Sequence, residues 1–242
     1  MAEEFGNPHD MGNVVRRFEG KGVVGPMIGF IIGLGLTVLG IWALVQTNDD
    51  EYGYLRMALL FGGVVLLVSV IELGYALGNH LVVLFEDGFI YSNTRKLVAA
   101  HWSDIQAVWQ LHRRGRGATI RYTVKIRGIE KPLVLTVDHF KDVDDLGKII
   151  QNQVTQVLLP KYIAALREGK RVKFGNFAID NQGISSGNKL VPWEKIQHVN
   201  IRNGAVMIKQ EGQWIAWPQV MVADIPNLFV FLTLVDRIVK VS

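Results

Sequence analysis

The chain has 242 residues, of which 49% are apolar, and its 26 Lys+Arg against 22 Asp+Glu give a net charge of +4. It contains no cysteine, which excludes a disulfide framework, a thiol nucleophile and a cysteine-based metal site. The basic excess lies after residue 78, and the first 78 residues are net acidic. A basic domain attracts anionic lipid headgroups or nucleic acid, and the alternative is a merely solvated basic surface.

The first third of the chain is dominated by two apolar stretches. Residues 1–22 are polar and unpatterned, and we interpret them as a flexible cytosolic tail. The stretches 23–46 and 55–77 each reach the ~20 apolar residues that cross a bilayer as a helix. Residues 23–78 are therefore expected to form a two-helix transmembrane hairpin.

Charges around these stretches indicate an orientation. The positive-inside rule predicts a multi-pass protein of the cell (cytoplasmic) membrane with both termini cytoplasmic. The second stretch holds one acid, Glu72, and an intramembrane acid is a functional candidate by default. The alternative is an acid that reaches the interface or pairs with a basic residue. The basic residues before the first stretch are Arg16, Arg17 and Lys21.

Glycines four residues apart line one face of each apolar stretch. They are Gly25, Gly29 and Gly33 in the first stretch and Gly74 and Gly78 in the second. Small residues at this spacing allow two helices to approach closely. We expect the two helices to pack on each other through these faces, with a homo-oligomer of hairpins as the alternative.

From His80 onward the pattern changes to short β-rich segments. Asp87-Gly88 is a hairpin-turn signal, and 112–117 is a glycine-rich basic loop. A helical stripe then runs from Val143, with Asp142 as its N-cap and Pro160 as an expected break or kink. The expected strands are 81–86, 89–92, 97–102, 105–111, 118–126 and 131–138.

A second β set follows a short basic linker at 169–171. Asn203-Gly204 is its clearest hairpin signal. Asp224 precedes a last helix with an apolar stripe from Leu228 to Ile238. The expected strands are 172–180, 184–186, 189–193, 196–202, 205–210 and 213–218.

The two β sets are copies of one pattern, Trp-x-x-Ile-x-x-Val, followed in each case by more strands and a helix. We interpret the shared residues as core positions that fix a strand. Detecting such a repeat makes each copy one structural unit. The shared residues are Trp102, Ile105 and Val108 in the first copy and Trp193, Ile196 and Val199 in the second.

This order of elements, with the motif present twice, resembles the bacterial PH-like (pleckstrin-homology) and GRAM-like domains. Membrane-anchored proteins with such domains in tandem are often of unknown function. The resemblance implies a membrane α-hairpin plus an α+β body with two tandem PH-like β-barrel or β-sandwich repeats, each closed by a C-terminal helix. The repeats are expected at 79–169 and 170–242.

The sequence shows no catalytic or metal-binding motif. Its six histidines are scattered, and no nucleophile elbow or phosphate-binding loop occurs. We therefore expect no metal, no cofactor and no enzymatic activity. Arginines on hairpin loops can hold phosphate oxygens bidentately, and the alternative is a solvated turn. The ligand candidates for an anionic headgroup are Arg95, Lys96, Arg113, Arg114, Arg116 and Arg121.

These observations favour a membrane-anchored, non-catalytic module that binds lipid headgroups or protein partners at the inner membrane surface. The alternative is a structural scaffold that oligomerises, and a membrane enzyme or transporter is a more remote one. Nucleic acid is not an expected partner, because aromatic residues are not interleaved with the basic ones.

Overall fold

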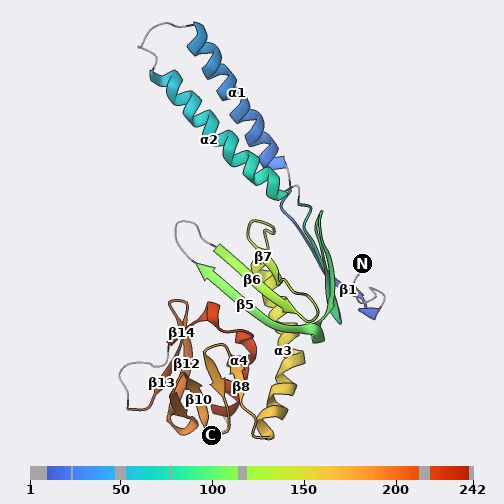
Figure 1. Cartoon of the computed structure of the whole chain (residues 1–242), viewed down its shortest axis with the longest axis vertical. Coiled ribbons are helices and arrows are strands. Elements are labelled where there is room, and N and C mark those ends of the chain that lie inside the picture. Colours follow the sequence, from blue (N-terminus) through green and yellow to red (C-terminus); the bar gives the residue numbers. More distant parts are fainter. Residues whose placement is uncertain are drawn as a thin grey trace.

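The computed structural model describes residues 10–22, 24–46, 53–76, 78–113, 119–212 and 219–239. Two helices form a long arm that projects from one end of an elongated body (Figure 1). The body holds the described strands, which form four small antiparallel sheets, and two further α-helices. The chain is therefore an α+β protein.

The arm consists of α1 (Val24–Gln46) and α2 (Gly53–Ala76), packed along each other. Glycine lets the two backbones approach, because a Cβ on Gly33 would lie 2.7 Å from the backbone nitrogen of Leu66. Gly29 faces Ser69 in the same way. The close packing expected through these two glycines is present. Gly74 differs, since nothing lies within 4 Å of the position where its Cβ would be.

The membrane assignment of this arm is contradicted. Among the described residues, no helix combines the length and the apolar character that a membrane crossing requires. By this finding the predictions of a membrane α-hairpin, of transmembrane helices and of a multi-pass membrane location are wrong.

The first half of the body, which we call unit 1, contains two sheets and a long helix. Its sheets have the strand orders β1-β2-β3-β4 and β5-β6-β7. The helix is α3 (Val143–Arg167). The strands are β1 (Val14–Glu19), β2 (Leu81–Phe85), β3 (Gly88–Ser92), β4 (Leu97–His101), β5 (Ile105–Arg113), β6 (Thr119–Ile126) and β7 (Leu133–Thr136).

The second half, unit 2, has the same construction. Its sheets have the orders β8-β9-β10-β11 and β12-β13-β14, and α4 (Leu228–Val239) follows them. The strand expected at 213–218 lies outside the described residues. The strands are β8 (Val172–Phe174), β9 (Phe177–Ile179), β10 (Gly183–Ser186), β11 (Lys189–Pro192), β12 (Ile196–Arg202), β13 (Ala205–Gln210) and β14 (Gln219–Met221).

Unit 1 begins before the arm, which the sequence did not indicate. Residues 14–19, expected within a flexible tail, form β1 and pair antiparallel with β2, Glu19 opposite Leu81. In unit 2 the equivalent pair, β8 and β9, is joined by the two-residue turn Gly175-Asn176. The arm is thus an insertion at the tip of the first β-hairpin of unit 1. Only Phe18 of β1 is buried, so its apolar pattern was too weak to predict a strand.

The predicted closed β-barrels or sandwiches are also corrected by the structure. Each unit has a separate four-stranded and three-stranded sheet, and no ladder joins the two sheets among the described strands. A 3₁₀ turn changes the chain direction between them, Trp102–Asp104 in unit 1 and Trp193–Lys195 in unit 2. What remains of the predicted fold class is an α+β body with a helix after each β set.

One continuous apolar core runs through both units. Helix α3 passes from unit 1 alongside unit 2, where it contacts β8 and α4 (Figure 1). Pro160 was expected to break or kink this helix, and the helix continues past it to Arg167. Packing of buried residues on both sides of the proline, such as Leu158 and Leu166, offsets the hydrogen bond that it removes.

Candidate functional site

The repeated tryptophan forms the same corner in both units. In unit 1 the indole Nε1–H of Trp102 donates to the Glu86 carbonyl at 2.9 Å. In unit 2 the indole of Trp193 donates to the Asp180 carbonyl at 3.0 Å. Both corners lead into a strand with a register shift just after its first residue. The corner fixes where β5 and β12 begin.

The motif residues differ in burial between the units. Trp102, Ile105 and Val108 are all buried in the core. In unit 2 only Ile196 is buried to that degree, whereas Trp193 and Val199 are partly exposed and pack against the core. The second corner is therefore the less covered one.

Asn227, at the start of α4, closes the free edge of β5. Its backbone N–H donates to the Val108 carbonyl at 2.8 Å, and its Oδ1 accepts from the Val108 N–H at 2.9 Å. Its Nδ2 donates to the Gln106 carbonyl at 3.1 Å. One side chain and one peptide group thus satisfy three groups of a strand edge. Asn227 has φ 54°, a conformation that asparagine tolerates.

The space beside this edge is also filled. The groove between β5 and α3 is lined by Val108, Gln151 and Val154. Phe229 and Val230 of α4 occupy it and leave no room for a water molecule. Unit 1 is therefore completed by the first turn of the helix of unit 2. Asn227 could not be predicted as a functional residue, because its one signal in the sequence is its position directly before an amphipathic helix.

The predicted basic candidates are partly brought together. Arg113 ends β5 and Arg121 lies in β6, both exposed. Arg121 is opposite Leu111, so it shares a sheet face with Arg113. Arg114 and Arg116 lie outside the described residues. The two described arginines form a small basic face at one end of the β5–β6 hairpin.

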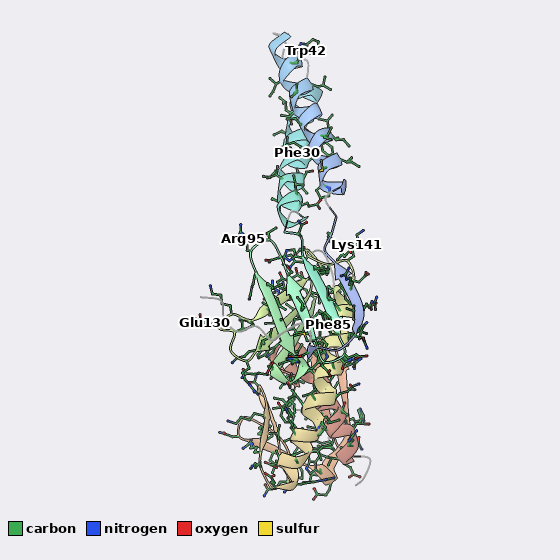
Figure 2. The ribbon with its side chains drawn as sticks, turned by 90° about the vertical axis from the view of Figure 1, so that its right-hand side faces the viewer. Phe30, Trp42, Phe85, Arg95, Glu130 and Lys141 are labelled. Carbon is green, nitrogen blue, oxygen red and sulfur yellow. The ribbon has the colours of Figure 1, made fainter. Side chains whose placement is uncertain are left out.

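Arg95 and Lys96 lie elsewhere, in the turn between β3 and β4 of the other sheet. The Asn93 side chain accepts hydrogen bonds from both of their backbone N–H groups, at 2.9 and 2.7 Å. This turn is near the base of the arm, where Figure 2 shows Arg95. The six predicted residues therefore do not form one site among the described residues. Glu72 is exposed on α2.

A polar cluster lies on the other face of the β5–β6 hairpin. The Tyr122 hydroxyl donates to Asp144 at 2.9 Å, and His112 lies 3.0 Å from the same hydroxyl. Lys148 pairs with Asp144 at 2.6 Å. Burial and the bond to Asp144 raise the pKa of the Tyr122 phenol well above its usual range. Burial alone would raise the pKa of Asp144, but hydrogen bonds from Lys148 and Tyr122 outweigh it and lower that pKa.

This cluster has a structural explanation. The buried Tyr122 ring lies directly on α3, where a Cβ on Gly147 would meet it at 2.2 Å. The phenol then reaches the first turn of the helix, where it donates to Asp144. Neutral Tyr122 is a donor held in place. The cluster anchors α3 on the sheet.

Two stacked histidines lie at the base of the arm. The rings of His80 and His139 are 3.9 Å apart. The Tyr91 hydroxyl lies 2.8 Å from His80 Nδ1. Burial, and then the neighbouring His139, lower the pKa of His80 to about 4. Burial also lowers the pKa of His139. Both rings are therefore neutral at pH 7 and join the arm to unit 1 as a packed pair.

The most exposed apolar surface belongs to the arm. Large side chains point outward around it, as Figure 2 shows for Trp42. Trp42 is 63% exposed and Phe61 of α2 is 65% exposed. Monomeric proteins seldom expose a continuous apolar surface of this kind without a partner for it. Within the described ranges, no cluster of three or more metal-ligating side chains was found.

These features define a class by architecture: an α+β protein with two like units and an apolar helical arm inserted in the first of them. The chain belongs to a family of unknown function, DUF6585, whose sequence profile matches residues 1–241. No curated protein matches the sequence.

Proposed function

We propose that this chain is a non-catalytic assembly protein, in which the arm binds the arm of a second copy and the two-unit body carries the partner-binding surfaces. The exposed apolar surface of α1 and α2 carries the proposal. Burying apolar area contributes roughly 25 cal/mol per Å², so two arms packed side by side gain a large free energy. Helix α1 offers no charged residue that such packing would bury.

The glycines of the arm favour a second helix pair as its occupant. Gly35 and Gly63 have nothing within 4 Å of their Cβ positions, in contrast to Gly29 and Gly33, which meet the other helix. Outward-facing small residues allow a further helix to approach closely. A bundle of two arms would bury the outward-facing Leu39 and Phe61, which are 63% and 65% exposed.

Unit 2 supplies the experiment that tests this proposal. Replacing residues 20–80 by Gly-Asn joins β1 to β2 as Gly175-Asn176 joins β8 to β9. We expect the whole chain to form a dimer or larger oligomer and the armless variant to be a folded monomer. Light scattering after size exclusion measures the masses, and circular dichroism verifies folding.

A matched pair of point variants separates assembly from folding of the arm. Leu39→Glu places a charge on the outward surface and should dissociate the oligomer. Lys209→Glu, at an exposed position of β13 in the body, should leave the mass unchanged. A whole chain that is strictly monomeric at micromolar concentration would contradict the proposal.

The resemblance to PH-like and GRAM-like domains supports the role of the body as a binding module and remains part of the proposal. A second candidate function is binding of phosphate-bearing groups by Arg113 and Arg121, because these two arginines share one sheet face. The double variant Arg113→Glu/Arg121→Glu should abolish binding of a soluble inositol phosphate measured by calorimetry. Arg202→Glu, at the end of β12, is the control.

A further inference from the structure

Unit 2 has a groove at the place where unit 1 has one. It lies between β12 and α4 and includes Val199, Asp236 and Val239 in its lining. Aligned on the tryptophan corners and helix starts, these residues correspond to Val108, Gln151 and Val154, which line the filled groove of unit 1. The groove of unit 2 is open, with a volume of about 590 Å³.

The edge of β12 beside the open groove corresponds to the edge of β5 in unit 1. Val199 lies opposite Ile208 as Val108 lies opposite Val124, each after the same register shift. The backbone N–H and C=O of Val199 therefore point away from β13, on the free side of β12. Those of Val108 point in the same way on the free side of β5. Strand β12 ends its sheet in the order β12-β13-β14. An uncovered edge beside an apolar groove is a template for another chain.

We propose that the β12–α4 groove is a docking site for a helix start of another protein, in which an asparagine is followed by apolar residues. The contact between the start of α4 and β5 within this chain shows which groups such a partner would present. Asn227 supplies one acceptor and two donors to the edge of β5, and Phe229 and Val230 fill the space behind it. The partner's asparagine binds Val199 and Gln197 in the same way.

A second copy of this chain does not supply the occupant. Asn227 of each copy is 5% exposed and already engaged on its own β5. The helix start of unit 1 has Asp142 at the corresponding position, and a carboxylate lacks the N–H donor that the Gln197 carbonyl requires. The partner is therefore a different protein, whose helix start resembles that of unit 2.

The rim of the open groove is more polar than its counterpart. His198 takes the place of the buried Ala107, and Asp236 takes the place of the buried Gln151. Polar rims around an apolar centre are typical of interfaces between proteins that also exist apart. The interface between units 1 and 2, which belong to one chain, has the buried Ala107 and Gln151 at these positions.

The probe for this site is a labelled synthetic peptide with the sequence of residues 222–233 and two added lysines for solubility. Its binding to the whole chain is measured by fluorescence anisotropy. We expect saturable binding that weakens about tenfold or more when the peptide carries Asn227→Ala, because the edge of β12 then loses its polar partners.

Two protein variants locate the binding. Thr233→Trp in the whole chain fills the groove and should weaken peptide binding about tenfold or more. Lys173→Trp adds the same side chain at an exposed position of β8 and should leave binding unchanged. Should Thr233→Trp misfold by circular dichroism, Val239→Lys replaces it. Absence of saturable binding up to about 1 mM, or binding that neither groove variant weakens, overturns the proposal.

Discussion

Units 1 and 2 share a corner, a register shift and a terminal helix, yet only unit 1 is complete. The free edge of β5 is bound by Asn227, whereas the equivalent edge of β12 borders an open groove. Unit 1 also accommodates the arm where unit 2 has a two-residue turn. In unit 1 the helix start of the following unit covers the strand edge, and among the described residues the equivalent edge of unit 2 has no such cover.

The units also fill the space under their helices differently. In unit 1 the large ring of Tyr122 lies against Gly147. At the corresponding positions unit 2 has Val206 on β13 and Leu232 on α4. Unit 1 thus has a large strand residue against a glycine, and unit 2 has a smaller strand residue and a larger helix residue at the corresponding positions. The two cores are therefore variants of one design.

Asn227→Ala is the strongest way to break the completed edge. It removes two side-chain hydrogen bonds, leaves the Val108 N–H and the Gln106 carbonyl without their partners, and places alanine at positive φ. We expect a loss of about 3–4 kcal/mol of unfolding free energy, measured by urea denaturation. Asn203→Ala is the matched control.

Asn203 has the same backbone conformation, with φ 52°, but lies in an exposed turn. Its replacement isolates the cost of the positive φ, which we expect to be about 1 kcal/mol. Equal losses for the two variants would show that the edge of β5 contributes nothing beyond backbone strain.

Gly147→Ala tests the exchange of volume between the units. The new Cβ meets the Tyr122 ring at 2.2 Å, so the ring or helix must shift. We expect a loss of about 2–3 kcal/mol. The double variant Gly147→Ala/Tyr122→Val has the smaller strand residue of unit 2 and should lose less than the sum of the two single variants. Additive losses would contradict the compensation.

Much of the fold could be predicted from local patterns. The helices of the arm were expected at 23–46 and 55–77 and are found at 24–46 and 53–76. Apolar runs and a polar link determine such limits locally. Strand β1 could not be predicted, because its neighbour β2 is separated from it by the whole arm. The hydrogen bonds of Asn227 to β5 are equally non-local, because Asn227 and Val108 are 119 residues apart in the sequence.

The candidate site was predicted less well, for a physical reason. Sequence shows which residues carry charge but not which loops meet. Arg113 and Arg121 share a face because one hairpin joins them, and this proximity follows from the sequence. Arg95 belongs to a different sheet, so its distance from them depends on the 3₁₀ turn after β4. The open groove is visible only once the two units are compared in space.

A pair of tryptophan variants measures how much each corner contributes to stability. Trp102→Phe and Trp193→Phe each remove one indole hydrogen bond to a carbonyl. Trp102 is 3% exposed, and Trp193 is partly exposed. We expect losses of about 2 kcal/mol for Trp102→Phe and about 0.5–1 kcal/mol for Trp193→Phe by urea denaturation, because water can reach the second carbonyl. Equal losses would show that the corners are equally covered.

The last effect depends on pH and concerns the base of the arm, which unit 2 lacks. Neutral His80 accepts a hydrogen bond from Tyr91 and stacks on His139, and its pKa is about 4 against 6.5 when unfolded. Below pH 6.5 the unfolded chain binds the proton that the folded chain excludes. Stability from this pair is therefore complete above pH 6.5 and is lost as the pH falls towards 4.

Urea denaturation at steps of pH measures this loss, and its comparison with His80→Gln isolates it. Glutamine has no proton to gain in this range, so the variant should show a flatter decline between pH 6.5 and 4. The armless variant lacks His80 and should decline as His80→Gln does. If His80→Gln keeps the wild-type slope, the stacked pair does not resist protonation.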